Sequence, residues 1–122
     1  MWQPRGAFAE PGLTWHVAGG GTPDVLLTLG GMLSGDDASL RFERSVERQA
    51  EISTVRRIHL DLHELEAIDL EGIAVLVHAY RESSRKGTAL TLEGATGPVR
   101  RRLLTTGILR IMEPPGTTAT AS

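Results

Sequence analysis

The sequence contains no cysteine and few aromatic residues: two Trp, one Tyr and two Phe among 122 residues. Without cysteine, the chain has no disulfide framework, no thiolate nucleophile and no cysteine zinc site. No stretch approaches the roughly 18 consecutive apolar residues of a membrane span, and residues 1–6 lack the apolar run of a signal peptide. We therefore expect a cytoplasmic protein with no membrane partner and a mainly aliphatic core.

Neither sign of charge predominates, since the formal net charge is −2. This balance argues against nucleic acid as a partner bound through bulk electrostatics. The length suits a single domain. Residues 1–12 hold two prolines and two glycines without periodicity, and residues 113–122 begin with a Pro-Pro-Gly turn after a glutamate. We expect a flexible arm at 1–12, one domain at 13–112 and a disordered tail at 113–122.

The elements expected along the chain alternate between strands and helices. Period-two patterns predict strands at 13–17, 25–29, 58–62 and 89–92, of which the first two form an antiparallel hairpin. Helices are expected at 38–50, 73–86 and 99–106, and a brief last strand at 108–112. The first helix has three N-cap candidates: Ser34, Asp36 and Asp37. This order predicts an α/β domain with a mixed sheet backed by helices.

The most informative stretch runs from Arg57 to Gly87. It begins with the strand-like run at 58–62 and continues into a helix-like run in which Ile73, Leu76, Val77 and Tyr80 are spaced i, i+3, i+4 and i+7. The residues between them, 69–72, should therefore form a short turn that leads into the positive end of a helix. Such a turn is a candidate site.

This stretch resembles the STAS family, the domain of bacterial anti-sigma factor antagonists. The family has a strand ending in aspartate, an Asp-Ser-Ser-Gly-like turn that opens a helix, and a basic, glycine-punctuated helix end. The matching segments are 60–62, 67–72, 84–88 and the proline-led 98–109. The resemblance covers residues 13–111. It implies a STAS-like mixed sheet of about four to five strands backed by three helices, and the sequence predicts that the family's final helix is absent.

The resemblance also implies a function, but this sequence differs from the family at the phosphorylated position. In the family, the second serine of the turn is phosphorylated by a partner that is both an anti-sigma factor and a GHKL-type serine kinase. Matched residue by residue, Leu70 and Glu71 replace the two serines, so the turn has no hydroxyl. We expect a non-enzymatic binding protein of sigma-factor regulation with no cofactor, whose Glu71 is a phosphomimetic. The missing helix would leave apolar surface to be covered either by a homodimer or by the N-terminal arm.

Glu71 has an ordinary interpretation as well, because a carboxylate in a first helical turn is favoured by about 0.3–1 kcal/mol. We favour partial imitation of phosphoserine, since the turn matches the family on both sides. On a helical wheel Glu71, Val75, His78 and Glu82 fall on one stripe. The apolar Val75 and Ala79 suggest a recognition surface, and the equally weighted alternative is that apolar helices of α/β domains carry such residues in any case. The predicted partner-binding residues share this turn and the helical stripe that continues from it: Asp69, Leu70, Glu71, Gly72, Val75, His78 and Glu82.

Three other constellations are weighed against ordinary structural roles. His59, Asp61 and His63 share a strand face and have ligand-type side chains, but a polar cluster without a metal is the better interpretation. Asp61, Asp69 and Glu71 are paired carboxylates without a nucleophile or a cofactor loop, so we predict no catalytic site. The hydroxyls near basic residues are weak phosphorylation candidates: Ser83, Ser84, Thr105 and Thr106.

Residues Arg100, Arg101, Arg102 and Arg110 form a small basic set, which we expect to be solvated. Two alternatives to the antagonist-like function stay open. One is a STAS scaffold that assembles through its sheet or helices. The other is an accessory ligand-binding domain associated with a transporter, for which the sequence has no signature of a pocket.

Overall fold

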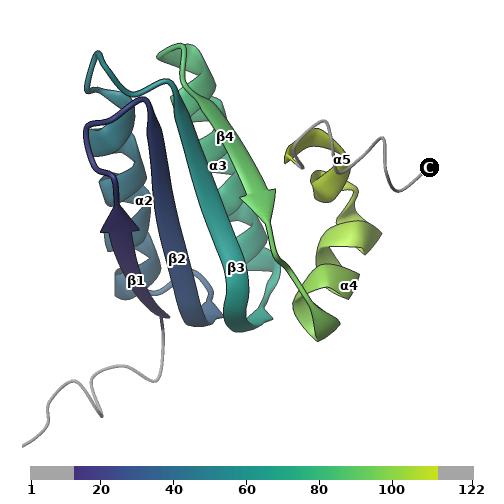
Figure 1. Ribbon diagram of the computed structural model, residues 1–122. Coiled ribbons are helices and arrows are strands. Elements are labelled where there is room, and N and C mark those ends of the chain that lie inside the picture. Colours follow the sequence, from purple (N-terminus) through teal and green to yellow (C-terminus); the bar gives the residue numbers. More distant parts are fainter. Residues whose placement is uncertain (1–12, 113–122) are drawn as a thin grey trace, which may run out of the picture.

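A computed structural model describes residues 13–112 and contains one four-stranded sheet within them (Figure 1). The strands lie in chain order: β1 (Leu13–Ala18), β2 (Asp24–Leu33), β3 (Arg57–Ile68) and β4 (Ala89–Glu93). β1 is antiparallel to β2, while β2–β3 and β3–β4 are parallel pairs. The predicted mixed sheet and its opening hairpin are therefore confirmed.

Four helices accompany the sheet in the described part of the chain: α2 (Asp37–Ala50), α3 (Leu70–Arg85), α4 (Gly97–Thr106) and α5 (Ile108–Met112). α2 and α3 cover one face of the sheet, whereas α4 and α5 lie beside its β4 edge (Figure 1). No helix of residues 13–112 combines the length and the apolar character needed to cross a bilayer.

The expected last strand at 108–112 is wrong, and with it the number of three helices. A strand would have placed Ile108, Arg110 and Met112 on one face and buried a guanidinium. The helix α5 instead buries Ile108, Leu109 and Met112 and leaves Arg110 exposed. On α4 the neighbouring leucines differ, since Leu103 is buried and Leu104 is exposed.

The core lies between the sheet and the helices α2 and α3. Its strand residues alternate as expected: Val25, Leu27 and Leu29 on β2; Ile58, Leu60 and Leu62 on β3; Leu90 and Leu92 on β4. Trp15 of β1 meets Phe42 of α2 edge to face, with ring centroids 6.0 Å apart. The opposite face carries His59 and Asp61, so the polar members of the β3 alternation face solvent.

Both central strands run further than the sequence pattern predicts. β2 continues beyond the expected 25–29 to Leu33, and β3 continues beyond the expected 58–62 to Ile68. The pairing of β2 with β3 shifts register between Thr28 and Gly30 and again between Gly31 and Met32. These irregularities break the period-two pattern by which a strand is recognised. Leu33 pairs with Ile68, so both following helices begin at the same end of the sheet.

Candidate partner-binding site at the start of helix α3

The turn predicted from the sequence is present as the N-terminus of α3. Asp69 is its N-cap residue, with extended backbone angles, and its side chain accepts a hydrogen bond of 2.8 Å from the backbone N–H of Gly72. The Asp69 N–H in turn donates to the carbonyl oxygen of Leu33, at 3.3 Å. An N-cap aspartate satisfies a backbone donor that the helix leaves free. Asp69 therefore fixes both the helix start and its place beside β2.

Gly72 is required by packing. An added Cβ would lie 2.1 Å from the carbonyl oxygen of Leu33 and 2.9 Å from the Ile68 side chain. No flexible group can move to relieve the first contact, because it is backbone. The first turn of α3 is thus pressed against the ends of β2 and β3, and Gly72 serves this approach rather than presenting a surface to a partner.

Glu71 lies in the first turn of α3 and is exposed. Its side chain extends over the loop that joins β2 to α2, since a Cβ built on Gly35 would meet the Glu71 carboxylate oxygen at 2.8 Å. The carboxylate therefore neither turns into the core nor leaves the helix start. It adds a full negative charge where the free N–H groups and the helix dipole favour one.

Leu70 gives the site an apolar element. Its side chain is 68% exposed, which makes it the most exposed large hydrophobic residue in the described part of the chain. An exposed leucine next to an exposed carboxylate offers a partner both an apolar contact and a charge. The turn therefore combines a buried anchor at Gly72 with two outward side chains, Leu70 and Glu71.

The expected exposure of Val75 and Ala79 is wrong. Val75 is 6% exposed and Ala79 is fully buried, so neither lies on a recognition surface. The helix is rotated relative to the expected stripe because its small residues pack inward: Gly72, Ala79 and Ser83. The exposed stripe that continues from Glu71 passes instead through Ala74, His78, Arg81 and Arg85. Its spacing of three and four residues was present in the sequence, but Ala74 gave no chemical signal.

His78 and Glu82 keep a place near that stripe, with partners of their own. His78 contacts Glu43 of α2 through its Nδ1 atom. Glu82 accepts a 2.7 Å hydrogen bond from Arg85 one turn later on α3. Of the seven predicted residues, Val75 is buried and Glu82 pairs with Arg85, and the other five divide into three groups. Asp69 and Gly72 build the turn, Leu70 and Glu71 face outward, and His78 lies at the contact between two helices.

Comparison with known proteins agrees with this geometry. A family model described as the STAS domain matches residues 21–121. The chain belongs to the STAS domain family. Among solved structures, the STAS fold is similar to that of the anti-sigma factor antagonist SpoIIAA in its unphosphorylated form, with a TM-score of 0.69 and 16% identity over 88% of this chain and 93% of that one.

Two further structures match this STAS domain. The Bacillus cell fate determinant SpoIIAA in its phosphorylated form gives a TM-score of 0.64 and 16% identity over 88% of this chain and 97% of that one. The murine anion transporter Slc26a9 gives 0.61 and 20% identity over 73% of this chain but only 14% of the transporter. These identities establish a shared fold, which occurs in antagonists and in transporters. No curated protein matches the sequence.

The open face of the STAS sheet separates the suggested histidine ligands. Asp61 and His63 form a pair, with Oδ1 and Nδ1 2.8 Å apart. His59 lies instead between Asp24 and Glu93, at 3.2 and 3.1 Å. The hydrogen bond from His59 lowers the pKa of Asp24. His59 therefore does not join Asp61 and His63 in one ligand set within the described residues.

The pair on this face holds its charges against burial. Burial alone would raise the pKa of Asp61, but the hydrogen bonds from the His63 side chain and backbone outweigh it, so the pKa lies below its ordinary value. The hydrogen bond to Asp61 raises the pKa of His63. The pair is an electrostatic feature of the sheet surface.

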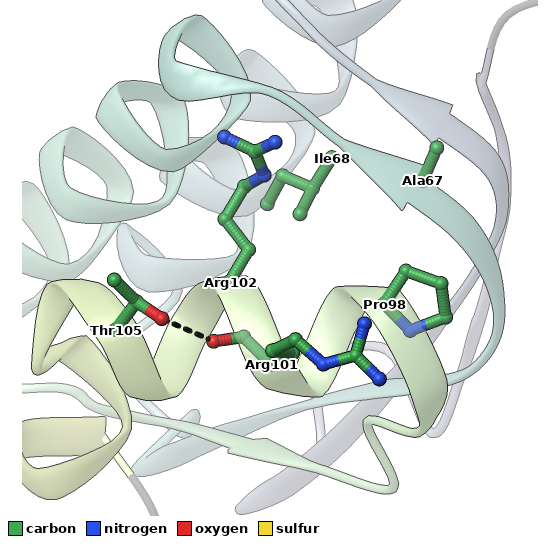
Figure 2. Close-up of a pocket in the computed structure, with 6 residues that line it drawn as sticks. All are labelled: Ala67, Ile68, Pro98, Arg101, Arg102 and Thr105. Atoms are coloured by element: carbon green, nitrogen blue, oxygen red, sulfur yellow. Dashed lines mark hydrogen bonds between the residues drawn. The ribbon is translucent and has the colours of Figure 1, made fainter.

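Two of the arginines line a cavity of about 410 Å³ between the end of β3 and α4. Ala67 and Ile68 form the strand side, and the helix side consists of Pro98, Arg101, Arg102 and Thr105. Figure 2 shows the Arg102 side chain extending toward Ile68 while the Arg101 guanidinium lies near Pro98. The sequence gave no sign of this cavity, because its strand side comes from the part of β3 that the pattern missed.

The hydroxyl candidates differ in accessibility. Ser83 is fully buried, so the hypothesis that it is phosphorylated in the folded protein is wrong. Ser84, Thr105 and Thr106 are exposed, although Thr105 donates its hydroxyl to the carbonyl of Arg101 and Thr106 to that of Leu103. Their modification stays a prediction.

Proposed function

We propose that this STAS domain acts as a non-enzymatic, antagonist-like binding module of sigma-factor regulation, in which Glu71 permanently occupies the place where relatives carry a switchable phosphate. The observation that supports this most directly is the position of the carboxylate: exposed, in the first turn of α3, beside exposed Leu70. Its partner would be an anti-sigma factor of the GHKL-type kinase class. The compartment would be the bacterial cytoplasm.

The imitation of phosphoserine is partial. Glutamate carries about −1 and two acceptor oxygens, whereas phosphoserine carries about −1.5 to −2 and three. In the family, the unmodified antagonist binds the anti-sigma factor and phosphorylation releases it. A permanent carboxylate therefore biases this chain toward the released state, or it requires a partner whose surface accepts the charge.

Loss of the hydroxyl gives a direct test with a kinase-type anti-sigma factor and ATP. The wild-type turn offers no acceptor at residues 69–72, so mass spectrometry should find no phosphate on the peptide that contains it. Glu71→Ser should gain one phosphate per chain there, because the serine occupies the same exposed helix start. Asp37→Ser, at the exposed first turn of α2, is the matched control and should gain none.

Phosphate on the wild-type turn peptide would contradict the proposal. So would phosphorylation of Asp37→Ser as efficient as that of Glu71→Ser, because recognition would then depend on any serine at a helix start. Circular dichroism of each variant would exclude loss of the fold as a cause.

A second candidate function follows from the cavity beside α4. Two guanidinium groups at a 410 Å³ cavity suit a small anionic ligand, as an accessory domain of a transporter would require. Arg102→Ala should then weaken binding of an anion such as sulfate, measured by calorimetry, while Arg110→Ala on α5 should not.

The scaffold hypothesis predicts a homodimer, which light scattering tests. A monomer at millimolar concentration would contradict that hypothesis.

A further inference from the structure

A cluster of three ligand-type side chains lies between α2 and α3, away from the turn. Glu43 and Glu47 are one turn apart on α2, and His78 faces them from α3. One ligand atom from each lies within 4.8 Å of the others. His78 contacts Glu43 through Nδ1, and the same Nδ1 is 3.9 Å from the Glu47 carboxylate. Three donors from two helices therefore point to one place.

The glutamates of the cluster are largely buried, whereas its histidine is exposed to solvent. The Glu43 side chain is only 12% exposed and that of Glu47 is 27% exposed, while that of His78 is 56% exposed. Glu43 and Glu47 are four residues apart, which puts both side chains on one face of α2. Helix packing, rather than two flexible loops, holds the donors in place. An ion could enter from solvent without opening the core.

The arrangement around His78 differs from that of two other histidines. His59 addresses Asp24 with Nε2 and Glu93 with Nδ1. His63 addresses Asp61 with Nδ1 and Glu64 with Nε2. In both cases each carboxylate lies near a different ring nitrogen, so the two do not compete for the same N–H group. At His78 both carboxylates face the same nitrogen, so one proton on Nδ1 serves only one of them.

A divalent cation resolves that geometry, since it can accept Nδ1 and both carboxylates together. We propose that Glu43, Glu47 and His78 bind a divalent transition-metal ion, for which Zn²⁺ fits the donor set best. Zinc takes imidazole nitrogen and carboxylate oxygen at about 2.0–2.2 Å, while Mg²⁺ and Ca²⁺ prefer oxygen alone. Three protein ligands leave a fourth position for water on the exposed side.

Such a site would join α2 to α3 independently of the proposed role of Glu71. His78 lies seven residues along α3 from Glu71, two turns of the same exposed stripe. An ion bound only by the folded protein stabilises the fold by mass action. Zinc binding therefore has a readout that needs no anti-sigma factor.

The test uses the untagged full chain, freed of metal by chelation, with ZnCl₂ alone as the probe. Calorimetry should give one Zn²⁺ per chain, and thermal unfolding should shift upward with Zn²⁺ but not with equal Mg²⁺. His78→Ala and Glu47→Gln should each weaken Zn²⁺ binding roughly tenfold or more, because losing a ligand should cost at least as much as losing a group that only orients a ligand. Glu47→Gln keeps the size of the side chain, so it separates ligation from packing.

His63→Ala is the matched control. Its side chain is 55% exposed, against 56% for His78, and also has two carboxylate neighbours. It should bind Zn²⁺ as tightly as the wild type does. No Zn²⁺ binding by the wild type would overturn the proposal, and so would equal affinity in wild type, His78→Ala and Glu47→Gln. Loss in His63→Ala alone would place the ion on the sheet and also overturn it.

Discussion

The starts of α2 and α3 are built alike and differ in what they present. Each helix follows a strand, and the two strands finish at the same end of the sheet. Each has an aspartate N-cap, Asp36 or Asp69, that accepts from the N–H three residues later, at 2.9 and 2.8 Å. Each has a further acid in its first turn, Asp37 or Glu71. An acidic first turn is therefore ordinary in this domain.

The third residue after each N-cap marks the difference. In α2 it is Ser39, whose hydroxyl accepts from the N–H of Ser34, so that the helix start closes on its own loop. In α3 it is Gly72, pressed against the carbonyl of Leu33. The α3 start is thus held by backbone packing, and its neighbouring side chains stay exposed. Asp37 and Glu71 are both exposed, so what distinguishes them is the backbone contact that holds the start of α3 against the end of β2.

The largest expected effect concerns that packing. Gly72→Ala should lower the free energy of unfolding by about 3 kcal/mol, because the new methyl group meets a backbone carbonyl that cannot move aside. Urea denaturation measures it. Gly35→Ala is the control: its methyl group would meet the flexible Glu71 carboxylate and should cost less than about 1 kcal/mol. Equal losses would refute the asymmetry.

The caps should behave equally. Asp36→Ala and Asp69→Ala should each cost about 1 kcal/mol, since each removes one side-chain acceptor from a helix N-terminus. Their urea midpoints should shift by similar amounts and their m-values should not change. A much larger loss for Asp36→Ala would mean that the α2 start, and not that of α3, carries the more important packing.

A carboxylate remote from both helix starts gives the smallest effect. Asp61 is stabilised as an anion by His63, whose own pKa is raised. The contribution of His63 is lost as the pH rises through its folded pKa, and that of Asp61 is lost as the pH falls through its folded pKa. Their charged pair therefore contributes most at roughly pH 4 to 6.5. NMR should show the His63 midpoint falling in Asp61→Asn; an unchanged midpoint would contradict the pairing.

Local signals in the sequence predicted the parts of the fold that local chemistry decides. Asp36 was among the expected N-caps, and Gly87, in the glycine-punctuated helix end at 84–88, adopts a positive φ. The hairpin and the helix after Asp69 followed from alternation and from 3.6-residue periodicity. Each of these depends on residues close together in the chain.

The errors concern long-range packing. The rotation of α3 that buries Val75 depends on how closely Gly72 lets the helix approach β2, which no periodicity contains. The grouping of Glu43 and Glu47 with His78 depends on the packing of α2 against α3, two helices between which β3 lies in the sequence. The cavity beside Arg102 depends on the length of β3, whose register shifts hide its second half. Side-chain type was visible in each case, but proximity was not.

The most direct measurement of the central claim is the affinity for a family-type anti-sigma factor, by calorimetry, of wild type, Glu71→Ser and Asp37→Ser. If Glu71 imitates the phosphorylated state, Glu71→Ser should bind roughly tenfold more tightly, because the substitution removes a negative charge that opposes binding. A tenfold change in affinity corresponds to about 1.4 kcal/mol of binding free energy. Asp37→Ser should bind as the wild type does. Equal affinities of Glu71→Ser and wild type would show that the carboxylate is only a favourable helix start.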